Sequence, residues 1–339
     1  LRNTLASHQE FQDSAWALPQ CVLDEMNEVC QKLAPTTQSL KSRWLFEQGM
    51  FSLGDPSFRS DYTSREVELA RLRTEALSLI LAQEGFKKIF DLAASSGWPE
   101  IVGSTLAQLS DDYDSIMLSL LSNTEEVSQK VASAYLAGRL SMEPTLQDQL
   151  LQEAPDYETQ AIVLLLTRNA ESAQDALAEL DPEVAELYWQ RFPIYGIGAK
   201  EGESSKVAAE LIRFGRPAAA VQFINTYDHE VDMTSETAEL ITLAFESIVD
   251  NNASDPEVKN LHAYELTELF EKLAYHHDHL GEKRLALLEW NLYPLREWKT
   301  DMPTFHKVLI QDPDLFVKLV SWAYPPDLNE PNGKVQDQD

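Results

Sequence analysis

The chain has 339 residues, 44% of them hydrophobic, and a formal net charge of −29. The length allows two compact domains or one elongated helical array, and the hydrophobic content excludes general disorder. The Lys and Arg residues divide 13 and 14 between residues 1–170 and 171–339, and they form no basic stripe of the kind that binds nucleic acid or an anionic membrane.

Few segments show the alternating pattern of strands, and only 12 glycines interrupt the runs of Leu, Ala, Glu, Gln and Ser. We therefore expect an all-α fold. Cys21 and Cys30 fall on opposite sides of one predicted helix, roughly 13 Å apart, which is too far for a disulfide. Two unpaired thiols and the lack of any apolar run of bilayer length predict a cytoplasmic protein.

The predicted helices begin with an N-terminal helical segment over residues 1–82. This segment contains a helix around Leu40 to Met50, the breaker Gly54-Asp55-Pro56, and a long periodic run from Ser64 to Ala82. Residues 83–191 are predicted to form irregular helical hairpins. The later helices of this segment are expected at residues 113–122, 125–140, 144–152, 157–168, 171–180 and 182–191.

The most obvious loop lies at Phe192 to Ser205, where three glycines follow a proline. Residues 204–324 are predicted to form hairpins and terminal helices, the last from Pro303 to Trp322 with an interruption near Pro313. Residues 325–339 are rich in Pro, Asn, Asp and Gln and are predicted to be a disordered tail. The chain lacks an initiator Met, as expected of a portion excised from a larger protein.

A helix–turn–helix pattern recurs in register around Gly215 and Gly281. At identical offsets from the two glycines stand Val207, Ala208, Ala220 and Ile224 in one copy and Leu273, Ala274, Ala286 and Trp290 in the other. The glycines lie 66 residues apart, which is twice the length of a tetratricopeptide-type unit. Gly97 shares the pattern in part, with Ile89, Phe90, Val102 and Leu106 at the same offsets.

The two copies resemble tetratricopeptide (TPR) repeats, and the other helix pairs are closer to HEAT-type hairpins. They depart from the TPR motif at His277, where an aromatic residue is usual, and no clean third copy lies between them. The resemblance implies a right-handed α-solenoid of stacked helix hairpins, with TPR-like hairpins in residues 204–324. Such units bury their apolar faces only by stacking, so they present interaction surfaces more often than catalytic pockets.

A second resemblance covers residues 285–317, through Leu285 to Leu295, Phe305-His306-Lys307 and Asp312 to Val317. This stretch resembles the C-terminal helical region of large bacterial multidomain proteins of unsettled function. Some such regions follow nucleotide-binding modules in prokaryotic defence proteins. The resemblance implies that the chain is one portion of such a protein, with the effector or ATPase elsewhere.

We therefore predict a non-enzymatic interaction scaffold or sensor segment that needs no cofactor and binds a protein or peptide. A basic peptide in an acidic groove is the more specific hypothesis, and a purely structural coupling segment is another interpretation. The predicted binding residues are polar positions beside the packing stripes of the two copies, namely Lys206, Glu210, Arg213, Glu268, Glu271, Lys272 and His276.

The alternative from another class is a metal-dependent enzyme that uses the histidine cluster at 276–279. His276 and His279 have the i, i+3 spacing that can place two imidazoles on one metal, with Asp278 or His262 as a third ligand. The same histidines also suit a helix C-terminus just before Gly281, where a protonated imidazole interacts favourably with the helix dipole.

Other constellations indicate little chemistry. Asp111-Asp112-Tyr113-Asp114 lacks the spacing of a calcium loop, and the glycine-rich run from Gly196 to Gly202 follows no predicted strand, which disfavours a phosphate loop. A group of four aromatics is expected to pack between helices, with an exposed binding hot spot as the other interpretation. These aromatics are Tyr188, Trp189, Phe192 and Tyr195.

Overall fold

The structure, a computed structural model, describes residues 2–49, 52–59, 61–167, 169–196, 204–227, 233–250, 256–295 and 302–323. Within these ranges the regular elements are α-helices and short 3-10 helices, with no strand. The predicted all-α class is therefore confirmed. No helix in the described ranges combines the length and the apolar composition needed to cross a bilayer. The predicted tail at 325–339 lies outside them.

The chain divides into two compact units. Unit 1 comprises Leu1–Arg168 with Glu179–Tyr188, and unit 2 comprises Asn169–Ala178 with Trp189–Asp339. The first unit holds 28 acidic and 13 basic residues, and the second holds 28 and 14. Each unit therefore carries about half of the negative charge.

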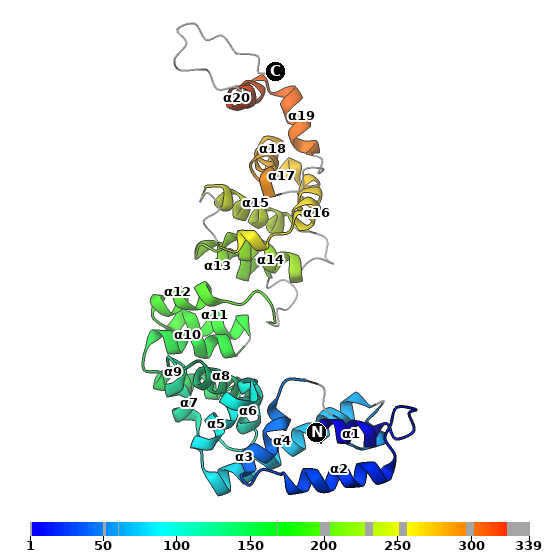
Figure 1. Cartoon of the computed structure of the whole chain (residues 1–339). Helices are drawn as coiled ribbons and strands as arrows, with labels where there is room; N and C mark the ends of the chain where they lie inside the picture. The colour runs from blue at the N-terminus through cyan, green and yellow to red at the C-terminus, as the bar shows by residue number, and fades with distance from the viewer. Residues whose placement is uncertain are drawn as a thin grey trace, which may run out of the picture. The chain divides into compact units, whose positions relative to one another are not determined.

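The α-helices of unit 1 are labelled in Figure 1. The helices of this unit, with two short 3-10 helices η1 and η2, are α1 (Arg2–Glu10), α2 (Gln20–Lys32), α3 (Gln38–Ser42), η1 (Arg43–Phe46), η2 (Pro56–Arg59), α4 (Tyr62–Glu84), α5 (Lys87–Ser96), α6 (Pro99–Ala107), α7 (Asp114–Leu120), α8 (Glu126–Met142), α9 (Leu146–Glu153), α10 (Tyr157–Leu166) and most of α12 (Pro182–Arg191). From α4 to α10, each packs mainly on helices one to three places along the chain. This nearest-neighbour packing is typical of helical arrays.

The long periodic run forms α4, which extends beyond the predicted bounds at both ends. The Asp61 side chain caps its N-terminus by accepting a bond of 2.9 Å from the Ser64 N–H. The helix expected from Leu40 to Met50 is shorter than predicted. It consists of α3 and the 3-10 helix η1, which ends at Phe46.

A carboxylate from α4 binds the N-terminus of the short helix α3. Glu84 accepts hydrogen bonds from the Gln38 and Ser39 N–H groups, at 2.5 and 3.2 Å, and from the Ser39 hydroxyl at 2.7 Å. The hydroxyl bond and the backbone bonds lower the pKa of Glu84. The ionised side chain thus satisfies donors that a helix N-terminus leaves without partners.

A buried ion pair joins α1 to α4. The Glu10 carboxylate is fully buried, forms a salt bridge with Arg65, and accepts a bond of 3.1 Å from the Leu53 N–H. Arg59 donates to the Glu10 backbone carbonyl and forms an ion pair of 2.5 Å with Asp13. Loss of one partner from a buried pair is costly, so these contacts hold the first helix in place.

The closest helix crossing in unit 1 lies between α6 and α8. A methyl group on Gly103 would overlap the carbonyl oxygen of Val131, and one on Gly138 would lie 2.9 Å from the Cβ of Ala107. Gly103 and Ala107 on α6, like Ala134 and Gly138 on α8, are four residues apart, and each pair therefore lies on one helix face. Small residues here let the two backbones touch.

Unit 2 contains most of α11 (Ala170–Glu179), together with α13 (Ser204–Arg213), α14 (Pro217–Tyr227), α15 (Ser235–Asp250), η3 (Val258–Asn260), α16 (Ala263–Ala274), α17 (His277–Leu280), α18 (Glu282–Asn291), η4 (Tyr293–Leu295), α19 (Pro303–Gln311) and α20 (Pro313–Ala323); its α-helices are labelled in Figure 1. Helix α15 packs on α13 and α14 and also on α17 and α18. It therefore joins the two copies of the sequence pattern.

The two copies differ in structure although their offsets agree. In the first copy α13 is continuous, Gly215 has φ +77°, and α14 begins at Pro217. In the second, α16 ends at Ala274 and a separate short helix, α17, precedes Gly281. Gly97 is the closer structural match to Gly215, because it has φ +74° and is also followed two residues later by a proline that begins a helix.

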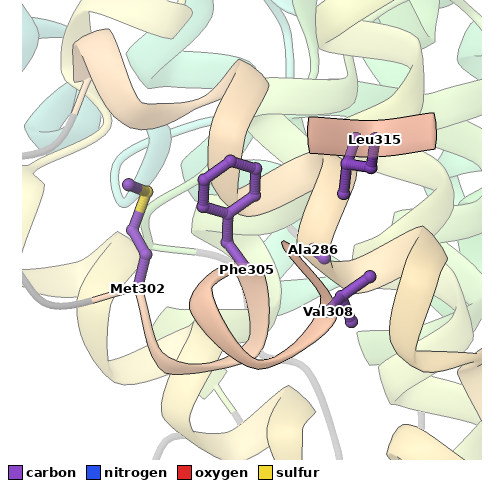
Figure 2. Packing of buried hydrophobic residues seen from close by; sticks show 5 residues of the cluster. All are labelled: Ala286, Met302, Phe305, Val308 and Leu315. Carbon is purple, nitrogen blue, oxygen red and sulfur yellow. The ribbon is translucent and has the colours of Figure 1, made fainter. Parts of the chain in front are cut away.

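The stretch that carries the second resemblance forms the core of α18, α19 and α20. Figure 2 shows its buried residues Ala286, Met302, Phe305, Val308 and Leu315. The ring of Trp290 stacks on Phe305 with centroids 5.1 Å apart. The buried Glu289 carboxylate accepts a bond of 2.7 Å from the Phe305 N–H, at the start of α19.

The interruption predicted near Pro313 is confirmed. Asp312 accepts bonds of 3.0 and 3.1 Å from the Asp314 and Leu315 N–H groups, at the start of α20. The residues that define the resemblance thus have structural roles in packing and capping these three helices.

Replacement of Gly103 by alanine tests the α6–α8 crossing. Alanine normally stabilises a helix by about 1 kcal/mol relative to glycine. At this position the added methyl group meets the Val131 carbonyl, and we expect destabilisation of about 3 kcal/mol. Urea unfolding followed by circular dichroism measures it, with Ser104→Ala on the same helix as the control. A Gly103→Ala protein as stable as the wild type would contradict this crossing.

The cap on α3 predicts a pH dependence. A lowered pKa means that the ionised Glu84 carboxylate stabilises the fold above its unfolded pKa of about 4.3, and that this contribution is lost as the pH falls through the folded value. Glu84→Gln should therefore lower Tm slightly at pH 7, and the difference should vanish in acid. Glu66→Gln, on the same helix, is the control. A difference independent of pH would contradict the carboxylate cap.

Candidate interaction surfaces

The predicted binding residues of the first copy lie along α13. Lys206 and Arg213 are exposed, Glu210 is half-buried, and the Arg213 guanidinium forms an ion pair of 3.0 Å with Glu210. Lys206 also lines a small hollow with Ala170, Glu171, Gln174 and Val207. Mixed charges that bond within one helix make this a weak site for a charged ligand.

The predicted residues of the second copy lie on and beside the exposed face of α16. Glu268 and Glu271 are exposed and lie close together on this face, and the Lys272 ammonium on its flank is 2.8 Å from the Glu268 carboxylate. His276 is half-buried in the break between α16 and α17. The predicted residues thus lie on separate helices, α13 packing on α14 and α15, and α16 on α18.

The two glutamates lie between two exposed tyrosines. Tyr264 and Tyr275 are 68% and 87% exposed, at either end of α16. The positions 264, 268, 271 and 275 fall within an arc of about 60° on a helix with 100° per residue. We call these four residues the α16 stripe. The opposite side of the helix is buried, through Leu266, Leu269, Phe270 and Leu273.

The N-terminal end of the α16 stripe has further aromatic neighbours. The His262 ring stacks on Tyr264 with centroids 5.7 Å apart. The carboxylate of Glu265 accepts a hydrogen bond of 3.3 Å from the Tyr264 hydroxyl and raises the pKa of Tyr264, with a smaller contribution from Tyr195. The phenol therefore stays neutral and retains its hydrogen-bonding capacity at neutral pH.

Arginines in unit 2 bind carboxylates that would otherwise repel one another. Arg284 on α18 makes paired bonds of 2.6 and 2.7 Å to Glu246 and of 2.8 and 2.9 Å to Glu239, both on α15. Arg216 makes a similar pair to Glu257 and donates to the backbone carbonyls of Trp189 and Phe192. These cations connect helices and so belong to the fold.

One member of the histidine cluster, His277, bonds to the end of α16. The Nδ1 atom of His277 lies 2.9 Å from the Ala274 carbonyl oxygen at the end of α16, and its Nε2 lies 3.4 Å from Asp278. Nowhere in the described ranges do three His, Cys, Asp or Glu side chains converge to hold a metal ion. The geometry thus supplies no third ligand beside His276 and His279.

Three of the four aromatics at 188–195 are core residues, as predicted. Tyr188, Trp189 and Phe192 are buried, and the Trp189 ring stacks near Phe214 at 6.4 Å. Tyr195 is exposed, which matches the other interpretation at this one position. Of the glycine-rich run, residues 197–202 lie outside the described residues.

Asp114 of the acidic run binds residues of α8. It accepts a bond of 2.7 Å from the Tyr135 hydroxyl and one of 3.2 Å from the Arg139 guanidinium. Burial, followed by the bond to Asp114, raises the pKa of Tyr135. This part of the run therefore stabilises the fold.

The binding residues predicted from the sequence do not include Tyr264 and Tyr275. Both fall on the helix face opposite the Leu and Phe residues that form the core stripe of α16. The apolar periodicity of this helix therefore predicts the exposure of the two tyrosines as well as the burial of the core stripe.

No family model, curated protein or solved structure matches this chain. The TPR, HEAT and bacterial multidomain resemblances are therefore predictions that rest on the residues quoted for them.

Removal of metal tests the histidine alternative. We expect EDTA to leave Tm unchanged and added Zn²⁺ to leave it unchanged as well, because a ligand stabilises a fold only where it binds the native state. Differential scanning fluorimetry measures both. A fall in Tm with EDTA that Zn²⁺ reverses in the wild type, and that is absent from His276→Ala, would contradict this expectation.

Proposed function

We propose that the chain is a non-enzymatic protein-interaction scaffold whose α16 stripe receives a basic peptide segment. The observation that carries the proposal is the pair of exposed tyrosines, Tyr264 and Tyr275, at the two ends of an exposed pair of glutamates. Tyrosine supplies a large contact area at low entropic cost and is enriched among the residues that dominate binding energies.

The chemistry of the α16 stripe selects a cationic ligand. The glutamates attract Lys or Arg side chains, and the tyrosine rings can stack against guanidinium groups. Lys272 forms an ion pair with Glu268 and neutralises part of the negative charge. Glu271 is therefore expected to attract a ligand cation more strongly than Glu268 does. Unit 2, with 28 acidic and 14 basic residues, attracts such a ligand over a longer range.

The size of the α16 stripe sets the size of the ligand. From Tyr264 to Tyr275 the helix rises about 16 Å, which an extended peptide covers with about five residues. The proposed ligand is therefore a short segment with basic residues near its middle. The proposal includes the right-handed solenoid of TPR- or HEAT-like hairpins that the sequence predicts, and in such a stack the exposed side of α16 would be open to a ligand.

A fluorescent oligo-arginine peptide tests the proposal by fluorescence anisotropy. We expect Tyr264→Ala and Tyr275→Ala each to weaken binding about tenfold, the loss that corresponds to 1.4 kcal/mol. Tyr62→Ala is the matched control, since Tyr62 is 66% exposed but lies on α4 in unit 1. Binding should weaken as salt rises.

A pair of charge variants separates the α16 stripe from general attraction by an acidic protein. Glu268→Gln with Glu271→Gln should weaken binding, whereas Asp148→Asn with Glu183→Gln, which removes the same charge elsewhere, should change it little. Equal losses in both pairs, or an unchanged affinity in the tyrosine variants, would overturn the proposal. Far-ultraviolet circular dichroism checks that all variants are folded.

A further inference from the structure

Helix α2 is the least covered of the longer helices in unit 1. Its one fully buried residue is Leu23, and the helix packs on α1. Met26 and Cys30 are half-buried on the same side as Leu23. The other side chains of this helix are exposed to solvent and are not part of the core.

A second apolar row runs along α2 beside the buried one. Val22, Val29 and Leu33 are 36%, 45% and 73% exposed, and Met26 lies between them. The positions 22, 26, 29 and 33 follow the spacing of four, three and four residues that forms the seam of a two-helix contact. We call these four residues the α2 seam. Over about 17 Å, or three turns, its apolar side chains are exposed or half-buried in the part of the chain that the structure describes.

The spacing of the α2 seam indicates that its ligand is a helix. An extended peptide repeats its side chains every second residue, whereas an apolar row at four- and three-residue intervals matches another helix of the same period. Contacts of this kind bind through the i, i+3, i+4 and i+7 positions of an amphipathic helix.

The net charge of the helix and of unit 1 decides between the possible ligand helices. Glu25 and Lys32 flank the α2 seam, Lys32 also forms an ion pair of 3.6 Å with Glu28, and Asp24 lies on the opposite side of the helix, so that α2 carries a net charge of −2. Unit 1 as a whole holds 28 acidic and 13 basic residues. A second copy of this chain would bring the same negative charge, whereas a basic helix would be attracted.

We propose that the α2 seam is a docking site for a basic amphipathic helix of another protein. Three turns of contact fall in the size range of weak, transient interfaces, so the affinity is expected to be micromolar. This site lies in unit 1, uses apolar packing and takes a helix. It is therefore independent of the α16 stripe in unit 2.

The probe is a synthetic helical peptide with leucine at its a and d positions and lysine at e and g, with a matched peptide in which glutamate replaces every lysine. Isothermal titration calorimetry with the full chain should show binding of the lysine peptide and at least tenfold weaker binding of the glutamate peptide. Hydrogen exchange should become slower in residues 20–33 when the lysine peptide is bound.

Variants of the protein locate the site. Val29→Glu and Leu33→Glu should each weaken binding at least tenfold, because each places a charge in the seam. Asn27→Glu adds the same charge to an exposed position of α2 outside the seam and should leave the affinity within about twofold or improve it. All three positions are exposed, so the variants are expected to fold, which circular dichroism checks.

Three outcomes would overturn the proposal. Equal binding by Val29→Glu and the wild type would place the ligand elsewhere. Equal affinities for the lysine and glutamate peptides would show that the site does not select a basic helix. A concentration-dependent dimer in light scattering that Val29→Glu abolishes would assign the α2 seam to a second copy instead. If the α2 variants lose the helical lysine peptide but still bind oligo-arginine at α16, the result supports this proposal independently of the proposed function.

Discussion

Burial of one apolar face per helix, against helices close in the chain, is the constraint on which the rest of the structure depends. Most of these helices are too short to be stable alone: isolated helices below about 12–15 residues are marginal in water, and α7 has 7 residues and α9 has 8. Stability therefore comes from contacts such as the α6–α8 crossing at Gly103 and the cluster around Phe305. Because the apolar residues of each helix are buried in the core, the opposite faces contact solvent and are available to ligands.

The distribution of charge follows from the same constraint. Buried and half-buried cations connect helices: the buried Arg65 holds α1 to α4, and the half-buried Arg139 and Arg284 hold α7 to α8 and α15 to α18. Most of the other basic residues in the described ranges are exposed, but acidic residues outnumber basic ones about two to one in each unit, and the outer faces therefore carry an acidic excess. A protein of this kind attracts basic ligands over a long range, and local side chains such as the two tyrosines of α16 must supply the selectivity.

Much of the fold follows from the sequence because its signals are local. Periodicity predicts α4, α8 and α10, and the structure confirms the helix start predicted at Pro182 and the interruption predicted near Pro313. The offsets around Gly281 wrongly predict one continuous helix before this glycine. The helix instead breaks at Tyr275 and His276, where His277 bonds to the Ala274 carbonyl, and no apolar pattern marks this break. Of the residues proposed for binding, Glu268 and Glu271 are predicted from the sequence and lie on the exposed face of α16, whereas the exposure of Tyr264 and Tyr275 follows only once the buried face of the helix is known. Long-range bonds such as Glu10 to Arg65 leave no signal in one sequence.

Zero-length cross-linking tests most directly whether recognition is concentrated on α16. A carbodiimide couples a carboxylate to a lysine amine in contact with it, so a lysine-containing basic peptide bound at the α16 stripe should be coupled chiefly to Glu268 or Glu271, as mapped by mass spectrometry. Other carboxylates, among them Asp148 and Glu183, are also exposed and provide an internal comparison. Enrichment at α16 that Tyr275→Ala reduces is the predicted result. Cross-links spread evenly over the acidic residues of both units, unchanged by that substitution, would contradict it.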